Sequence, residues 1–75
     1  MTASDAYDLS QPCTSTLRRI LPHTHDNALA ADLLFLERWE MAPLPGPASA
    51  LRISQIRRAN PELAAAIRAE INAVK

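Results

Sequence analysis

The stretch that decides the fold is NALAADLLFLERWEM, from Asn27 to Met41. More large apolar side chains gather here than in any other segment: Leu29, Leu33, Leu34, Phe35, Leu36, Trp39 and Met41. On a helix at about 100° per residue they leave no clean polar face, because the charged residues fall singly between apolar stripes. A helix that is apolar nearly all round is normally buried on several sides. The stretch therefore predicts a central helix over about residues 25–41, covered by other elements or by another chain.

Both ends of this helix carry recognisable signals. Thr24 or Asp26 can accept hydrogen bonds from the free amides of the first turn. Pro43, Pro45 and Pro47 cannot continue a helix, because proline lacks an N–H and clashes with the preceding turn. They predict a stiff connector over residues 42–48. The apolar stretch is too short and too charged to cross a membrane, which takes about 20 apolar residues.

The length and composition point to association with another protein. The 75 residues predict one small domain, residues 12–75, preceded by a flexible N-terminal arm, residues 1–11. One cysteine allows no internal disulfide, yet 48% of the residues are apolar. A small domain has little volume in which to hide such a surface. We therefore expect a homodimer or a tight complex with a different protein, with Leu33, Phe35, Leu36 and Trp39 partly buried between chains.

Charge is balanced over the chain, with eight basic and eight acidic residues, but the two halves differ. Acidic side chains predominate through Pro47, and basic ones predominate from Ala48. One interpretation is that the halves attract each other within one fold or across a dimer. The other is a basic patch for an acidic partner, for which the candidate residues are Arg57, Arg58 and Arg68.

Three further helices are expected around the central one. A short helix over about residues 14–21 begins near Thr14 or Ser15 and ends at Pro22. Residues 49–59 are ambiguous, because Leu51 and Ile53 alternate as in a strand while Ile53 and Ile56 are spaced as in a helix. We prefer the helix, since no second strand exists to pair with it.

The C-terminal segment has the clearest helical pattern. Asn60 suits the N-cap, Pro61 the first helical position and Glu62 the first turn, which predicts a helix over about residues 61–74. One narrow apolar seam runs along it through Leu63, Ile67, Ile71 and Val74. Alanines line much of the rest and would let another helix approach closely. The expected fold is thus all-α, a small domain of three to four helices packed as a homodimer.

Catalytic and cofactor chemistry find little support in the residues. Cys13, His23, His25 and Asp26 contain the atom types that bind zinc, but their spacing is poor and no second cysteine exists. Cys13 with His23 or His25 could form a thiol–imidazole pair, but no obvious group orients the histidine. A single glycine rules out a glycine-rich phosphate loop. We expect no enzyme, metal or cofactor. The first residues lack the basic and apolar regions of a secretory signal, so we expect a cytoplasmic protein.

Two classes of function remain. The first is a non-enzymatic protein-binding module, an adaptor, regulator or inhibitor of a larger protein. The second, less favoured, is a helix-turn-helix-like DNA-binding regulator using residues 50–75, in which Arg57 and Arg58 contact phosphates while Arg68 and Asn72 reach base edges. The alanine-rich second helix and the lack of net positive charge count against DNA, because phosphate contacts normally dominate such binding.

Overall fold

Residues 12–74, the part that this computed structural model describes, form helices and contain no strand. In chain order the elements are α2 (Ser15–Ile20), the 3-10 turn η1 (Leu21–His23), α3 (Asn27–Met41), α4 (Pro47–Ala59) and α5 (Pro61–Val74). The predicted all-α class is confirmed, and residues 49–59 are helical rather than extended. The predicted N-terminal arm, residues 1–11, lies outside the described residues.

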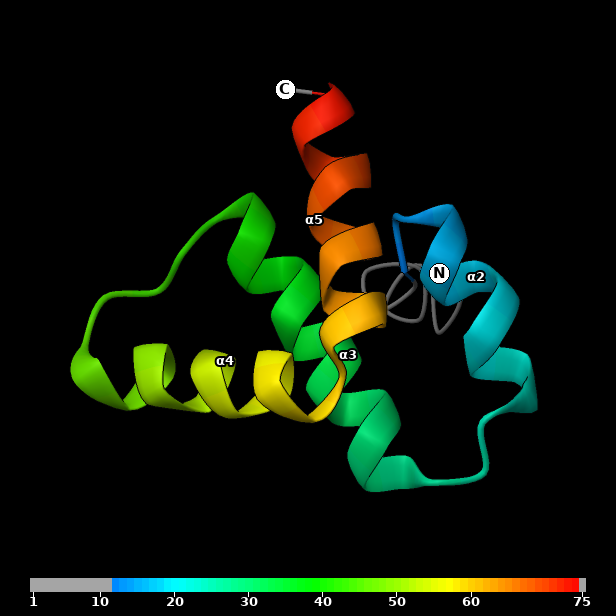
Figure 1. The fold of residues 1–75 in the computed structure, drawn as a ribbon, viewed down its shortest axis with the longest axis horizontal. Helices are drawn as coiled ribbons and strands as arrows, with labels where there is room; N and C mark the ends of the chain where they lie inside the picture. Colours follow the sequence, from blue (N-terminus) through cyan, green and yellow to red (C-terminus); the bar gives the residue numbers. More distant parts are fainter. Residues whose placement is uncertain (1–11, 75) are drawn as a thin grey trace, which may run out of the picture.

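The central position of α3 is also confirmed (Figure 1). α4 crosses α3, and α5 rises from the end of α4 and packs against both of these helices. α2 packs against α5 on the side opposite α4. Two helices of the same chain, α4 and α5, therefore pack against the most apolar segment.

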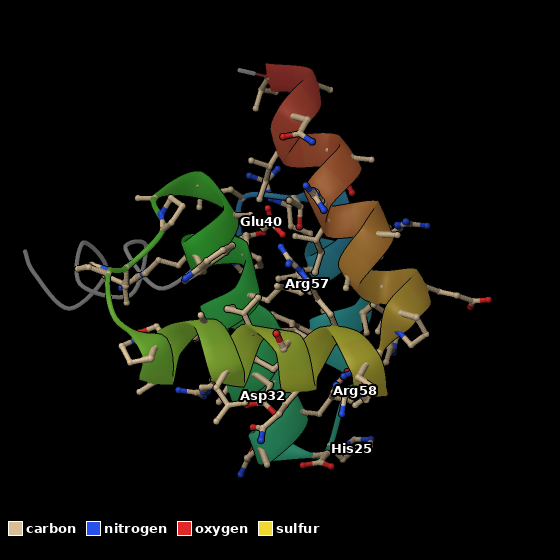
Figure 2. All side chains as sticks on the ribbon, turned by 60° about the vertical axis from the view of Figure 1, so that its left-hand side comes forward. His25, Asp32, Glu40, Arg57 and Arg58 are labelled. Carbon is tan, nitrogen blue, oxygen red and sulfur yellow. The ribbon has the colours of Figure 1, made fainter. Side chains whose placement is uncertain are left out.

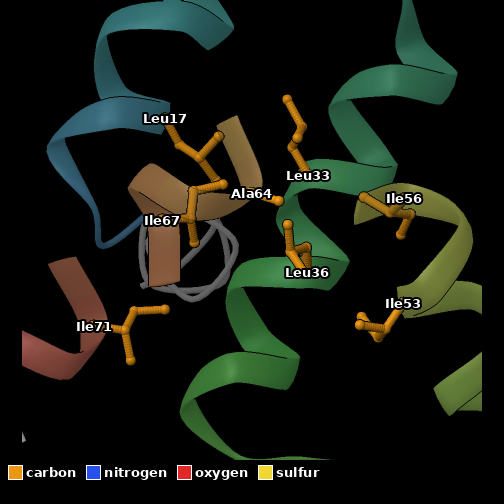
Figure 3. Close-up of a cluster of buried hydrophobic side chains, with 8 residues drawn as sticks. All are labelled: Leu17, Leu33, Leu36, Ile53, Ile56, Ala64, Ile67 and Ile71. Carbon is orange, nitrogen blue, oxygen red and sulfur yellow. The ribbon is translucent and has the colours of Figure 1, made fainter. Parts of the chain in front are cut away.

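The core lies where these helices meet (Figure 3). Its buried apolar members are Leu17, Leu33, Leu36, Ile53, Ile56, Ala64, Ile67 and Ile71. Each described α-helix contributes at least one of them, so detachment of any of these helices would expose core side chains to solvent. Burial of a leucine or isoleucine side chain stabilises a fold by about 1.5–3 kcal/mol before entropy is counted.

Leu33 and Leu36, which we expected partly between chains, belong to this core instead. Both are 0% exposed within the single chain. A chain of this size encloses more apolar surface than we expected, because its most apolar helix lies in the middle of the fold. Within residues 12–74, four large apolar side chains do remain exposed: Met41, Leu44, Leu51 and Val74. The homodimer itself stays a prediction.

The ends of α3 follow from local chemistry. The Asp26 carboxylate accepts from the backbone N–H of Ala28 at 3.0 Å and of Leu29 at 3.1 Å, so Asp26 is the N-cap and the helix begins at Asn27. The alternative cap, Thr24, donates its hydroxyl to the Ile20 carbonyl at 3.0 Å. The helix ends at Met41, just before the proline connector.

α4 begins two residues earlier than predicted, at Pro47, which occupies the first helical turn. Gly46 precedes it with φ +110°, a backbone conformation that residues with a side chain rarely adopt. Glycine thus lets the connector turn sharply into the helix. The helical spacing buries Ile53 and Ile56 and leaves Leu51 60% exposed.

α5 has the predicted bounds, and Asn60 joins it to α4. The Asn60 carbonyl accepts from the Ala64 N–H at 2.9 Å, while its side-chain amide donates back to the Ile56 carbonyl at 3.3 Å. The predicted seam is correct for Ile67 and Ile71. It fails at Val74, which is 84% exposed, because the last turn of α5 projects beyond the other helices (Figure 1).

α2 is shorter than predicted, and Pro22 does not end it. Thr14 is the N-cap, and the α-helix passes at Leu21 into η1. Pro22 fits there because the first residues of a helical turn need no N–H donor.

Candidate functional site

Two arginines of α4 cover the aromatic residues of α3. The Arg52 guanidinium carbon lies 4.2 Å from the centre of the Phe35 ring, and that of Arg57 lies 5.3 Å from the Trp39 ring. Both distances are within the range of a cation–π contact. Phe35 and Trp39 are therefore half-buried beneath charged side chains of their own chain rather than open to a partner.

Each of these arginines also pairs with an acidic residue of α3. Arg52 Nη2 lies 3.2 Å from Asp32 Oδ1 in an exposed pair. Arg57 donates to the carboxylate of Glu40, whose side chain is only 9% exposed (Figure 2). The interpretation that the two halves attract each other within one fold is confirmed by these pairs. The Arg57 pair is the stronger constraint, because an exposed pair contributes at most about 1 kcal/mol.

A groove of about 450 Å³ runs along α5 beside Arg57. Its lining residues are Arg57, Pro61, Ala64, Ala65, Arg68, Ala69 and Asn72. The alanines make it shallow and smooth, since a methyl group is all that projects from the helix at these positions. Ala64 belongs to the core, whereas Ala65 and Ala69 are exposed.

The groove is positively charged. Among the described residues, no acidic side chain lines it and two arginines do. Arg57 is neutralised by Glu40, but Arg68 is exposed and no described side chain pairs with it. Arg68 is thus a guanidinium with its hydrogen-bond donors available to a ligand.

The structure brings together some of the predicted partner-binding residues and separates others. Arg57 and Arg68 line the same groove, although they come from different helices. Arg58 points to the other side of α4 and is exposed (Figure 2). Leu33 and Leu36 lie in the core, on the inner face of α3.

A second polar arrangement, not predicted from the sequence, holds the start of α2. Glu37, only 3% exposed, accepts from the Cys13 N–H at 2.9 Å and from the Thr14 N–H at 2.8 Å and hydroxyl at 2.7 Å. Glu70 accepts from the Ser15 N–H at 2.8 Å and hydroxyl at 2.6 Å. We call Glu37 and Glu70 the carboxylate clamp.

The carboxylate clamp satisfies backbone donors that the helix itself cannot. Besides the bonds above, Glu70 accepts from the Thr16 N–H at 3.0 Å and from its hydroxyl. The Ser15 hydroxyl is the main cause that lowers the pKa of Glu70 from its ordinary 4.5 to about 2, followed by the Thr16 hydroxyl and the backbone. Negative charge is also favoured at a helix N-terminus. The clamp therefore orients α2 against α3 and α5.

The signal for this clamp was present but incomplete. Three consecutive hydroxyl residues, Thr14 to Thr16, precede the apolar part of α2, and such residues commonly cap helices. A carboxylate inside the apolar central helix is also unusual. Neither observation says which acid meets which hydroxyl.

The other candidate ligands of the sequence are not gathered into a site. Cys13, His23 and His25 are exposed. Within residues 12–74, no group of three or more His, Cys, Asp or Glu side chains is placed to hold a metal ion.

The helices of this part of the chain are all too short or too polar to cross a membrane.

The fold and the groove thus define a small all-helical protein with a basic, alanine-lined surface. Comparison of the chain with family models, with curated proteins and with solved structures found no match.

Proposed function

We propose that this chain is a non-enzymatic protein-binding module, an adaptor, regulator or inhibitor, that binds a larger protein along α5. The observation that supports this most directly is the groove, which combines exposed alanines with the unpaired Arg68. Small side chains let another backbone approach closely, and arginine is enriched where proteins bind one another. The exposed Met41, Leu44 and Leu51 add apolar surface of the kind that interfaces use.

The contact surface differs from the one that the sequence suggested. We expected the partner on the apolar residues of α3, but Leu33 and Leu36 are enclosed and Phe35 and Trp39 lie under arginines. The proposal therefore moves the contact to α5 and keeps Arg57 and Arg68. Self-association remains one form that this binding can take.

Photo-crosslinking inside cells of the source organism tests the proposal. A photoreactive amino acid in place of Ala69, in the groove, is expected to form a covalent adduct with a protein. The matched control places it at Ser54, which is exposed on α4 and outside the groove, and should form none. Equal adducts from both positions, or no protein adduct from Ala69, would contradict the proposal.

The alternative is DNA binding by α4 and α5. It is favoured by the exposed Arg68 and Asn72, which lie one turn apart on the outer face of α5, as base-reading residues do on a recognition helix. Against it, Glu62 is exposed at the start of the same helix, and Arg57 is occupied by Glu40. A gel shift on mixed-sequence DNA distinguishes the two. Salt-sensitive binding that is lost in Arg68→Ala would favour DNA.

A further inference from the structure

We infer that the groove receives an amphipathic α-helix of the partner, which presents small side chains to the alanines and a carboxylate to Arg68. This inference rests on the proposed function and adds the shape and charge of the occupant. Three observations support it: the length of the groove, the size of the side chains that line it, and the uncompensated charge on one wall.

The length and form of the groove suit a helix. It follows α5 from Pro61 to Asn72, which is about three helical turns, or roughly 16 Å at 1.5 Å per residue. Binding by strand addition needs the edge of a sheet, and no strand exists in residues 12–74 to offer one. A helix laid along α5 needs no backbone hydrogen bonds from its host.

The side chains set how close that helix can come. Ala65 and Ala69 are exposed and spaced four residues apart, so they lie one above the other on the same face. Helices pack at axis distances of about 8 Å when the residues between them are small, and at about 10 Å when they are large. A partner with alanine, glycine or serine at the facing positions fits the closer distance.

The charge identifies the remaining feature of the partner. Among the acids on α5, Glu70 is engaged by Ser15 and Thr16, and Glu62 does not line the groove. The other groove arginine, Arg57, already has Glu40 as a partner. No acidic residue of the described chain pairs with Arg68, so its guanidinium is open to a carboxylate of the occupant, which can bind it with two parallel hydrogen bonds. Asn72, one turn away, supplies an amide to the same occupant.

A peptide selection tests this inference on the full chain. The probe is a displayed library of 14-residue, alanine-rich helical peptides with one randomised face. The wild-type chain is expected to enrich peptides that carry Asp or Glu beside a small residue. Binding is then measured by the fluorescence of Trp39, the only tryptophan, whose ring contacts the groove residue Arg57.

A charge reversal gives the sharper comparison. Arg68→Glu is expected to raise the Kd of the selected acidic peptides by at least about tenfold, the effect of losing one charge-assisted pair. A fresh selection on this variant is expected to enrich basic peptides. Arg58→Glu is the matched control, since it makes the same charge change at an exposed position outside the groove, and should bind like wild type. Circular dichroism confirms that both variants are folded.

Other outcomes separate this inference from the proposed function. The inference about charge would be overturned if the selected peptides show no preference for acidic residues, or bind Arg68→Glu as tightly as the wild-type chain. A protein adduct at Ala69 would still support a protein-binding module in that case. Absence of both adducts and peptides would overturn the two together. Arg68-dependent binding of DNA in place of peptides would also overturn the inference.

Discussion

At the scale of single residues, Arg57 contacts both the interior of the fold and the candidate surface. Its guanidinium lies over the Trp39 ring, pairs with the nearly buried Glu40 and lines the groove along α5. Arg52, five residues earlier on α4, makes the same two kinds of contact with Phe35 and Asp32, but its ion pair is exposed to solvent. The two arginines therefore allow a comparison in which burial is the main difference.

We expect Arg57→Ala to destabilise the fold more than Arg52→Ala. Loss of Arg57 removes an ion-pair partner from the Glu40 carboxylate, whose side chain is 9% exposed, and should cost about 2–3 kcal/mol of folding free energy. This cost is below the range for fully buried pairs, because the Arg57 side chain is 35% exposed. Loss of Arg52 breaks an exposed pair and should cost less than about 1 kcal/mol. Urea unfolding of both variants measures the difference. Equal losses would show that the Glu40 pair adds nothing to the fold.

Trp39 should tolerate phenylalanine far better than alanine. Its ring packs against the core, so Trp39→Ala should cost about 3 kcal/mol, the lower end for a buried aromatic residue. The indole N–H is buried without an acceptor among the described residues, and Trp39→Phe removes this unsatisfied donor together with some apolar area. We therefore expect Trp39→Phe to stay within about 1 kcal/mol of wild type.

Thermal unfolding followed by circular dichroism measures both tryptophan variants without the indole signal. A phenylalanine variant as unstable as the alanine variant would mean that the indole nitrogen has a partner in solution.

At the scale of elements, the carboxylate clamp explains how a helix as short as α2 stays in place. Six residues are too few for a helix to be stable alone in water. Glu37 and Glu70 satisfy the amide groups from Cys13 to Thr16, and Leu17 enters the core with 0% exposure. Tertiary contacts, rather than helix propensity, thus hold α2.

The clamp predicts that acid weakens the fold. Because the pKa of Glu70 is lowered from 4.5 to about 2, the unfolded chain binds more protons than the folded chain between these values. The contribution of Glu70 is therefore fully present above its unfolded pKa and is lost as the pH falls from about 4.5 towards 2. Denaturant unfolding at several pH values measures this loss.

Glu70→Gln should lower stability at neutral pH and flatten the pH dependence in that acidic range. The matched control is Glu62→Gln, an exposed glutamate at the start of the same helix that makes no hydrogen bond to the described residues. It should keep the wild-type pH dependence. Identical curves for the two variants would show that the clamp does not respond to protonation.

At the scale of the whole molecule, the core is complete within one chain. Leu17, Leu33, Leu36, Ile53 and Ile67 are the largest fully buried side chains, and helices of the same chain enclose all of them. Among residues 12–74, the apolar side chains left for a dimer contact are exposed ones such as Met41, Leu44 and Leu51.

We therefore expect the unfolding temperature to be nearly independent of protein concentration. The stability of an obligate dimer depends on protomer concentration by mass action. The stability of a monomer does not, and neither does that of subunits that fold independently and dimerise only weakly. Calorimetry between about 5 and 500 μM, roughly two decades, covers a range over which an obligate dimer would shift by several degrees. Such a shift would mean that one chain alone is not stably folded.

Most of the helix ends could be read from the sequence, although α4 begins two residues earlier than predicted and α2 is shorter than predicted. The Asp26 cap, the proline connector after Met41 and the Asn60–Pro61 junction each act on backbone groups within a few residues, so their effect can be read locally. The sequence also indicated that α3 is central, and it offered attraction between the two halves as one of two interpretations of their charges.

Only the tertiary structure decided which chain covers α3 and which acids meet which donors. Cys13 and Thr14 are 24 and 23 residues from Glu37, and Ser15 is 55 residues from Glu70, so no local pattern selects these pairs. The same holds for the groove, which Arg57 and Arg68 line together because α5 rises from the end of α4 after a single residue. Contacts between distant residues depend on how the helices pack, and packing depends on all the apolar faces at once.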